Sequence, residues 1–371
     1  MAAPARPDPA DGKAGRGPAP ASPVSGARAE GLDRLRGIAL VAMLVHHLID
    51  WFAGEAREVL PGWPLFALTD VAAVAFFVAA GASVALFLAS RARRGMPARR
   101  RAAQVVRRYG LLVPLGMGLQ WLLRGDPLGF GVLEALGVTV VLAAGLAAVV
   151  PDRGLPAATG TVLVLGVVTQ RVSAGSDGWF AAEVLHGTFP VVVYLGFVMV
   201  GILAVRSGAY RHRSATAAVA AGAVVATSWI LAARGTVPAR YPGDVEFVVP
   251  GLAGTVLVYG LAQTRWPVWL RGADRLLRRS GTHTLGLFVS HYVVNWVLVT
   301  TGATGSLATT PAVLTAVTIT LGLCLVAPHV PQPPWSVRTG WRRSPAVDPR
   351  PGGGPRPGPD LAPAPGRAPA G

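Results

Sequence analysis

Apolar segments of about 17 to 25 residues recur along this chain, the length of a helix that crosses the hydrocarbon layer of a membrane. Overall, 52% of the residues are hydrophobic and only 14% are charged. The mean hydropathy of +0.48 is high for a chain of this size. The sequence therefore predicts an all-α fold, a polytopic bundle of transmembrane helices.

The apolar segments divide the chain into ten candidate spans. Residues 1–27 are rich in Ala, Pro and Gly, and residues 331–371 in Pro and Gly, so we expect two disordered tails around a transmembrane domain at 28–330. The spans cover approximately residues 35–53, 66–90, 108–124, 132–150, 155–171, 184–205, 214–233, 246–263, 282–301 and 308–328.

Basic residues are concentrated in alternate loops between these spans. The odd-numbered loops and their flanks hold only Arg57, Arg124, Arg171, Arg234 and Arg240. Because cytoplasmic loops of membrane proteins are enriched in Arg and Lys, this asymmetry predicts that both termini face the cytoplasm. The net charge of +16 then mainly reflects the orientation of the chain in the membrane, and we expect the basic side chains to contact anionic lipid headgroups. Nucleic acid is not an expected partner.

Residue usage points to a bacterium with a GC-rich genome, and so to a multi-pass protein of the bacterial inner membrane. Lys13 is the only lysine, and Ala, Arg, Gly and Pro are heavily used. The single cysteine, Cys324, excludes an intrachain disulfide and argues against a structural metal site. We find no phosphate-cradling Gly loop, no metal-ligand spacing and no serine nucleophile elbow, so neither a metal nor a bound cofactor is expected.

The first apolar segment, DRLRGIALVAMLVHHLIDW, combines ionisable groups with a membrane-type sequence. Arg36 and His47 are eleven residues apart, so on a helix they share a face about 16 Å apart. With Arg36 at the inner edge, His47 lies near the middle of a layer about 30 Å thick, where ionisable groups are usually functional. His46 and His47 each lie within one turn of Asp50. Alternatively, Arg36 is a boundary anchor and the histidines bond neighbouring helices.

A further histidine lies at a similar depth in the span at 282–301. His291 follows Arg279 by twelve residues, about 18 Å along a helix. Two imidazoles near the midplane can line one cavity and supply a general base. The alternative is that His291 bonds the backbone of a neighbouring helix.

Charged residues at both membrane edges are candidates for substrate binding. Arg107 and Arg108 stand at a helix mouth beside a dense Arg cluster, where they can hold phosphates, although topology and lipid contact explain most of the cluster. Asp70 and Glu134 fall at the outer rim, where acids attract a cationic or hydroxyl-rich acceptor. Solvated loop acids would have the same pattern.

Four motifs, in order, resemble the heparan-α-glucosaminide N-acetyltransferase catalytic-domain family. DRLRGIALVAMLVHH is similar to its opening Asp-x-x-Arg-Gly-x-Ala signature, and LTDVAAVAFFVAAGASVAL to its second-helix pattern. GVLEALGVTVVL resembles Gly-Val-Leu-Gln-x-Leu-Gly-Val-Thr, and GTHTLGLFVSH resembles Gly-x-Asn-Ser-Leu followed by Tyr and His. The likeness runs from about Asp33 to Asn295, and the Arg-to-His spacing is also similar to that of acyltransferase family 3.

The resemblance implies acetyl transfer from cytosolic acetyl-CoA, a co-substrate, to an amino or hydroxyl group of a sugar-like acceptor across the membrane. Arg36, Asp70, His47 and His291 then take the places of motif residues, and Arg107 and Arg108 fall near the basic entry. Glu134 stands where Gln is usual, and His283 and Thr284 replace Asn and Ser. The lysosomal members carry a histidine in the first outer loop that this chain lacks, so a mechanism through that residue is not transferred.

These residues suggest a site at half depth with His47, Asp50 and His291 as catalytic groups. His46, Arg36, Arg107, Arg108, Asp70 and Glu134 are the candidates for substrate or acyl-donor binding. His47 would either deprotonate the acceptor or accept the acyl group itself, and the sequence leaves both routes open. The alternative function is a proton-coupled transporter or exporter with the same histidines as a proton relay. Against it, we find no inverted repeat and no helix pair broken at Pro or Gly.

Overall fold

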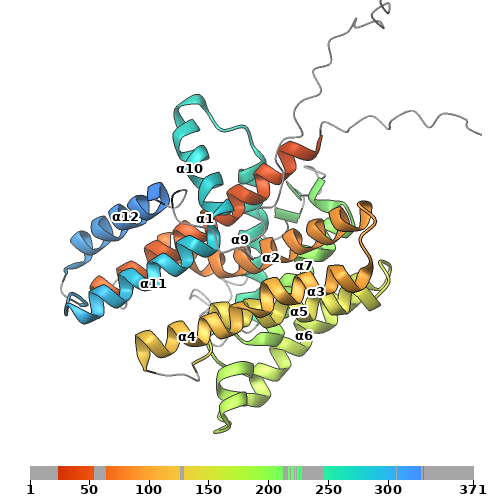
Figure 1. Ribbon diagram of the computed structural model, residues 1–371, viewed down its shortest axis with the longest axis horizontal. Helices are drawn as coiled ribbons and strands as arrows, with labels where there is room; N and C mark the ends of the chain where they lie inside the picture. The colour runs from red at the N-terminus through yellow and green to blue at the C-terminus, as the bar shows by residue number, and fades with distance from the viewer. Residues whose placement is uncertain are drawn as a thin grey trace, which may run out of the picture. The chain divides into compact units, whose positions relative to one another are not determined.

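The computed structural model describes most of the predicted transmembrane domain, and all regular secondary structure in the described residues is helical (Figure 1). The described residues are 24–53, 64–125, 129–211, 216, 217, 219, 220, 222, 224, 226, 227, 245–305, 307–326 and 329. The predicted all-α class is confirmed. The predicted span at 214–233 lies mostly outside the described residues, and the tail boundaries at residues 27 and 331 stay predictions.

Eleven labelled α-helices carry the described fold, together with short π and 3-10 turns (Figure 1). The α-helices are α1 (Val24–Ala53), α2 (Pro64–Arg93), α3 (Ala98–Gly110), α4 (Leu112–Arg124), α5 (Val132–Val149), α6 (Leu155–Ser173), α7 (Val191–Arg206), α9 (Val245–Gln263), α10 (Arg271–Thr282), α11 (Thr284–Thr300) and α12 (Thr309–Val326). The short turns are η2 (Phe180–Leu185), η3 (Ala209–Arg211) and η4 (Val268–Leu270).

Four of the described helices are long and apolar enough to cross a membrane: Glu30–Ala53, Val71–Arg93, Val132–Val149 and Leu155–Ser173. Three shorter apolar helices, Val191–Arg206, Thr284–Thr300 and Thr310–Val326, accompany them. A chain with several such helices is a membrane protein. The finer count of ten spans stays a prediction.

Two predicted spans have different bounds in the structure, and proline explains both. The segment expected at 108–124 is divided between α3 and α4. Pro114 has no N–H to donate to the carbonyl of Gly110, so the helical hydrogen-bond ladder is interrupted there. The segment expected at 184–205 becomes a regular α-helix only from Val191, after Pro190. A proline disfavours helical backbone in the preceding residue, which separates the π turn η2 from α7.

A sharp bend also separates α9 from the helix that follows it. The two helical segments Phe247–Gln263 and Val268–Thr282 meet at 108° across a short break that contains Pro267. The sequence-based expectation that no helix pair is broken at Pro or Gly was therefore wrong for this pair. The second arm is not apolar, because α10 carries four arginines and Asp274 within twelve residues.

Helix α1 is the centre of the described bundle, since it packs against α2, α9, α10, α11 and α12. Helix α2 in turn packs against α7, α9 and α5. The backbones of α2 and α7 approach closely because Gly81 faces the carbonyl of Val198 and Gly201 faces that of Val78. Small residues at helix crossings are typical of membrane proteins, where van der Waals packing drives association.

The α1–α10 crossing is equally close. A methyl group on Gly37 would overlap the carbonyl oxygen of Leu277, and one on Gly281 would overlap that of Asp33. No side chain can rotate away to relieve such an overlap, because the opposing atoms are backbone. The two glycines therefore fix how near α10 lies to the Asp33–Gly37 part of α1.

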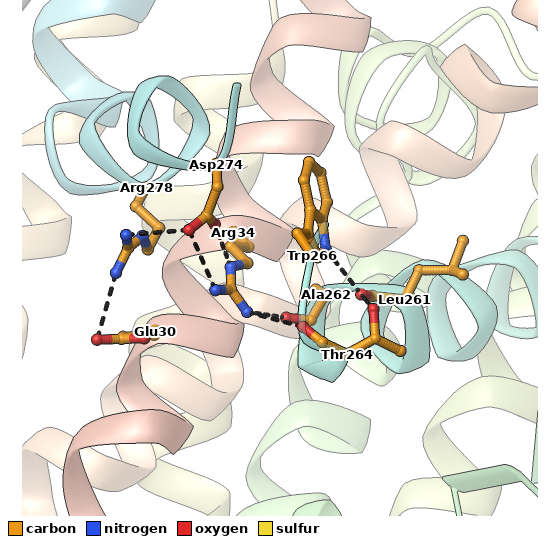
Figure 2. A network of polar contacts seen from close by, with 8 residues as sticks. All are labelled: Glu30, Arg34, Leu261, Ala262, Thr264, Trp266, Asp274 and Arg278. Atoms are coloured by element: carbon orange, nitrogen blue, oxygen red, sulfur yellow. Dashed lines mark hydrogen bonds and ion pairs between the residues drawn. The ribbon is translucent and has the colours of Figure 1, made fainter. Parts of the chain in front are cut away.

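A network of ion pairs and hydrogen bonds also joins α10 to α1 at this crossing (Figure 2). Arg34 binds Asp274 through Nε and Nη2, the second contact at 3.3 Å, and donates Nη1 to the carbonyl of Ala262 at 2.8 Å. Arg278 pairs with Asp274 at 3.0 Å and with Glu30 at 3.3 Å. Because Arg34 also satisfies a carbonyl at the end of α9, one side chain joins α1, α9 and α10.

Candidate active site

Three aromatic rings from α1 and α11 come together near one end of α1. The ring centroids of His47 and His291 are 5.6 Å apart, those of Trp51 and His291 5.7 Å, and those of His47 and Trp51 5.9 Å. The structure thus brings together two of the three predicted catalytic residues. They come from helices far apart in the sequence that pack against each other.

The arrangement of these rings is triangular. All three interplanar angles lie between 7° and 16°, so the rings are nearly parallel. In a linear stack the outer two centroids would be about twice as far apart as neighbours, whereas here the three separations are almost equal. Each ring therefore meets the other two mainly at its edges or with a large offset.

His291 is held in one tautomer by its own helix. Its side chain is buried, and Nδ1 forms a hydrogen bond with the carbonyl of Phe288. A carbonyl oxygen only accepts, so Nδ1 carries the proton and Nε2 is the basic nitrogen of the neutral ring. Phe288 and Tyr292 also contact the ring, with centroids at 4.7 Å and 4.5 Å. The imidazole is thus fixed in orientation while one nitrogen keeps its lone pair.

The Asp50 carboxylate contacts the other histidine of the first helix. Nε2 of His46 lies 3.3 Å from Oδ2 of Asp50, one helical turn away. Both side chains are mostly buried. The ring of His46 in turn lies edge-on to His47 with centroids 5.8 Å apart. Asp50, His46, His47 and His291 therefore form a continuous group.

The loop between α11 and α12 donates hydrogen bonds to the end of α1 beside this group of histidines. Gly305 donates its N–H to the carbonyl of Trp51 at 2.8 Å, and Leu307 donates to Phe52 at 3.0 Å. The backbone of Gly305 is left-handed, with φ of 68°, a conformation that glycine adopts without strain. These bonds satisfy carbonyls that a helix end leaves open, so Trp51 is held against both imidazoles.

The remaining predicted binding residues lie elsewhere in the bundle. Arg36 forms an ion pair with Asp33, one turn earlier on α1, and its Nε is buried without a hydrogen bond in the described residues. It is eleven residues from His47, about 16 Å along the helix. Arg107 is exposed on α3, and the Arg108 guanidinium lies 5.7 Å from the Tyr109 ring. Helix α3 packs against α5, α2 and α4.

The two predicted rim acids have different outcomes. Asp70 belongs to α2, but its side chain lies outside the described residues. Glu134 is almost completely buried, and Gly131 at the start of α5 donates its N–H to Oε2 at 3.1 Å. The alternative of a solvated loop acid is therefore wrong for Glu134.

A comparison with known protein families identifies the family of this chain. Residues 28–238 match the family described as heparan-alpha-glucosaminide N-acetyltransferase, catalytic. The chain belongs to this family. Membership implies an acetyltransferase, and the apolar helices place it in a membrane. No curated protein matches the chain.

The match to this acetyltransferase family covers α1 to α7 and ends before α9. His46, His47 and Asp50 lie inside the matched residues, whereas His291 lies outside them. Ring contact between His47 and His291 therefore links the matched part of the chain to the part that follows.

Trp51 was missed by the sequence reasoning, which assigned no tryptophan to a ligand. The signal was present, since Trp51 follows His47 by four residues and so lies on the same face of α1. Its contact with His291 depended on tertiary packing and had no local signal.

Proposed function

We propose that this protein transfers the acetyl group of cytosolic acetyl-CoA to an amino or hydroxyl group of a sugar-like acceptor at the outer side of a bacterial inner membrane. In this proposal ten spans cross the membrane and both termini face the cytoplasm. Family membership supports the reaction class. The distribution of arginines supports the orientation.

The observation that carries the proposal is the contact between His47 and His291. Both imidazoles lie on apolar helices, where a titratable group is costly unless it has a function. Acyl transfer to an amine or hydroxyl needs a base that removes one proton, and imidazole is suited to this near neutral pH.

In the proposed donor pathway, the CoA phosphates bind basic side chains at the cytoplasmic edge. Arg107 and Arg108 offer guanidinium groups at the end of α3, and Arg36 offers another on α1 beside Asp33. The thioester then extends along α1 toward His47. The distance of about 16 Å between Arg36 and His47 is within the length of a pantetheine arm.

Two routes complete the transfer. In the direct route, His47 takes the proton from the acceptor as its nitrogen or oxygen attacks the thioester carbonyl carbon. The C–S bond breaks, and the departing thiolate receives that proton. In the covalent route, an imidazole nitrogen attacks the thioester carbonyl carbon first, the C–S bond breaks, and the imidazole N–H proton passes to the CoA thiolate. The acceptor then attacks the acetyl-imidazole, the C–N bond breaks, and the acceptor's proton returns to the imidazole. The His46–Asp50 pair supplies a neighbouring carboxylate that stabilises positive charge on the imidazoles in either route.

The test is release of CoA by the purified protein supplied with acetyl-CoA and a panel of glucosamine and hydroxyl acceptors. We expect acceptor-dependent turnover, and His47→Ala to lower kcat by about 10²- to 10⁴-fold, the usual contribution of a general base. His186→Ala is the matched control, because this histidine contacts the Gln170 carbonyl on a different helix. Absence of turnover with every acceptor, together with proton-coupled uptake of a substrate, would contradict the proposed acetyltransferase and support the transporter instead.

The two routes are separated by incubation with labelled acetyl-CoA without an acceptor. The covalent route leaves a labelled protein and an initial burst of free CoA. The direct route gives neither.

A further inference from the structure

Helix α10 combines a sharp change of direction with a strongly basic sequence. The segment Phe247–Gln263 is apolar, and the segment Val268–Thr282 is turned from it by 108°, which is close to perpendicular. With Phe247–Gln263 along the membrane normal, α10 therefore lies almost parallel to the membrane surface. Its four arginines within twelve residues make it too costly to bury in the hydrocarbon layer. Both observations place α10 at a membrane edge.

The charged side chains of α10 fall on two sides of the helix. Asp274 and Arg278 form ion pairs with side chains of α1 inside the bundle (Figure 2). The other three arginines recur every four residues, so they form a row about 12 Å long on a separate side of the helix. This arginine row consists of Arg271, Arg275 and Arg279, and all three residues are exposed.

The arginine row has no acidic partner in the part of the chain that the structure describes. None of the ion pairs between described residues includes one of its members. Like charges one helical turn apart repel each other, so the row by itself destabilises α10. Bound phosphate groups would remove this repulsion, because guanidinium groups form charge-assisted hydrogen bonds with phosphate oxygens. The row is therefore complementary to an anionic surface that extends over about 12 Å.

Two exposed apolar side chains stand directly before the arginine row. Trp269 is 80% exposed and Val268 is 68% exposed, and both belong to η4. A soluble phosphate has no apolar part for these side chains to contact. The interface of a bilayer, in contrast, accommodates tryptophan among the lipid chains and arginine among the headgroups. The combination favours a phospholipid surface over a soluble anion.

We propose that η4 and α10 form an interfacial anchor that binds anionic phospholipids. The arginine row contacts the headgroup phosphates, and Val268 and Trp269 insert beside the first carbons of the acyl chains. The bent pair of α9 and α10 is then one span followed by a helix on the membrane surface, and not a re-entrant loop. This inference goes beyond the proposed acetyl transfer and does not depend on it.

The anchor also refines the expectation that basic side chains contact lipid. On α10, Arg278 joins helices through Asp274 and Glu30, whereas the arginine row is left for an external partner. Lipid binding is thus assigned to three named arginines and the two apolar residues before them.

The experiment measures quenching of Trp269 fluorescence by brominated lipids in nanodiscs that hold the full chain. The bilayer is phosphatidylcholine with an equal minor fraction of brominated phosphatidylglycerol or of brominated phosphatidylcholine, with bromine near the carbonyl end of the acyl chain. The signal of Trp269 is the difference between the unmodified protein and Trp269→Phe. We expect phosphatidylglycerol to quench it about fivefold more strongly, since one arginine near an anionic surface raises association by about that factor.

Substitutions in the arginine row test the role of its charge. The combined variant Arg271→Gln, Arg275→Gln and Arg279→Gln should be quenched equally by the two lipids. The combined variant with Lys at the same three positions should keep the preference, because it keeps the charge. All three residues are exposed, so both variants should fold.

The matched control removes three exposed charges from the region between α2 and α3, by Arg94→Gln, Arg99→Gln and Arg100→Gln. It should keep the preference at Trp269, because α3 packs against α2, α4 and α5 and not against α10. Loss of the preference in this control would show a general charge effect and would overturn local binding by the arginine row.

Other outcomes would also overturn the anchor. Equal quenching of the unmodified protein by the two lipids would reject selection of an anionic headgroup, and no quenching by either would place Trp269 outside the bilayer. Stronger quenching by bromine at the chain centre would indicate a re-entrant loop. Loss of the preference on addition of inorganic phosphate at constant ionic strength would make the row a site for a soluble anion.

Discussion

The two ends of α1 carry polar groups in opposite arrangements. At the first end, Arg34 and Arg278 meet the Asp274 carboxylate, so opposite charges neutralise each other across three helices (Figure 2). At the other end, His47 and His291 meet as rings of the same kind, and Trp51 contacts both of them. The first arrangement is suited to fixing helices, whereas the second keeps groups that can exchange protons. The difference predicts that mutations at the first end reduce stability and that mutations at the second reduce turnover.

The largest expected effect on stability tests the first end. Gly281→Val places a side chain on the carbonyl of Asp33, which cannot move without separating α10 from α1. Overpacking of this kind costs about 3 kcal/mol. The thermal unfolding midpoint of the detergent-solubilised protein should fall by many degrees. Gly272→Val on the same helix is the control, because no atom lies within 4 Å of the added group. Equal midpoints for the two variants would contradict the close crossing.

An intermediate effect is expected from removing the central charge of the network. Asp274→Asn leaves Arg34 and Arg278 facing a neutral amide. We expect a loss of about 1–3 kcal/mol, less than for a fully buried pair because these side chains keep some solvent contact. The unfolding midpoint measures it, and turnover per folded molecule should not change.

Asp152→Asn provides the comparison for the network, since its pair with Arg206 is at the surface and should contribute nothing measurable. A loss of turnover in folded Asp274→Asn protein would show that the first end of α1 also takes part in the chemistry.

The smallest expected effect concerns the other end of α1, where Trp51 contacts the two imidazoles. Trp51→Phe keeps an aromatic ring at this position but reduces its area of contact with the two imidazoles. Both imidazoles then lose part of the ring that holds their orientation, so kcat should fall roughly 3- to 10-fold, equal to about 1 kcal/mol of activation free energy, while the unfolding midpoint changes little. Trp269→Phe is the control, because Trp269 is highly exposed. A lower midpoint with an unchanged kcat would make Trp51 a packing residue only.

Local signals predicted much of the fold. Helices α1, α2, α5, α6, α9, α11 and α12 lie where the apolar segments indicated them. The sequence also placed two histidines within one helical turn of Asp50, and in the structure His46 is the one that pairs with that carboxylate. Helix α10 had no such signal, because it carries too many arginines to resemble a span.

The sequence by itself determined that this is a helical membrane protein with ionisable groups in its first apolar segment. It could do so because hydropathy and the 3.6-residue period are properties of neighbouring residues. Only the tertiary structure decided that His291 meets His47, that Glu134 is buried against Gly116, and that Arg34 reaches Asp274, 240 residues away. These contacts depend on how separate helices pack, and packing is set by the shapes of surfaces that no local pattern records.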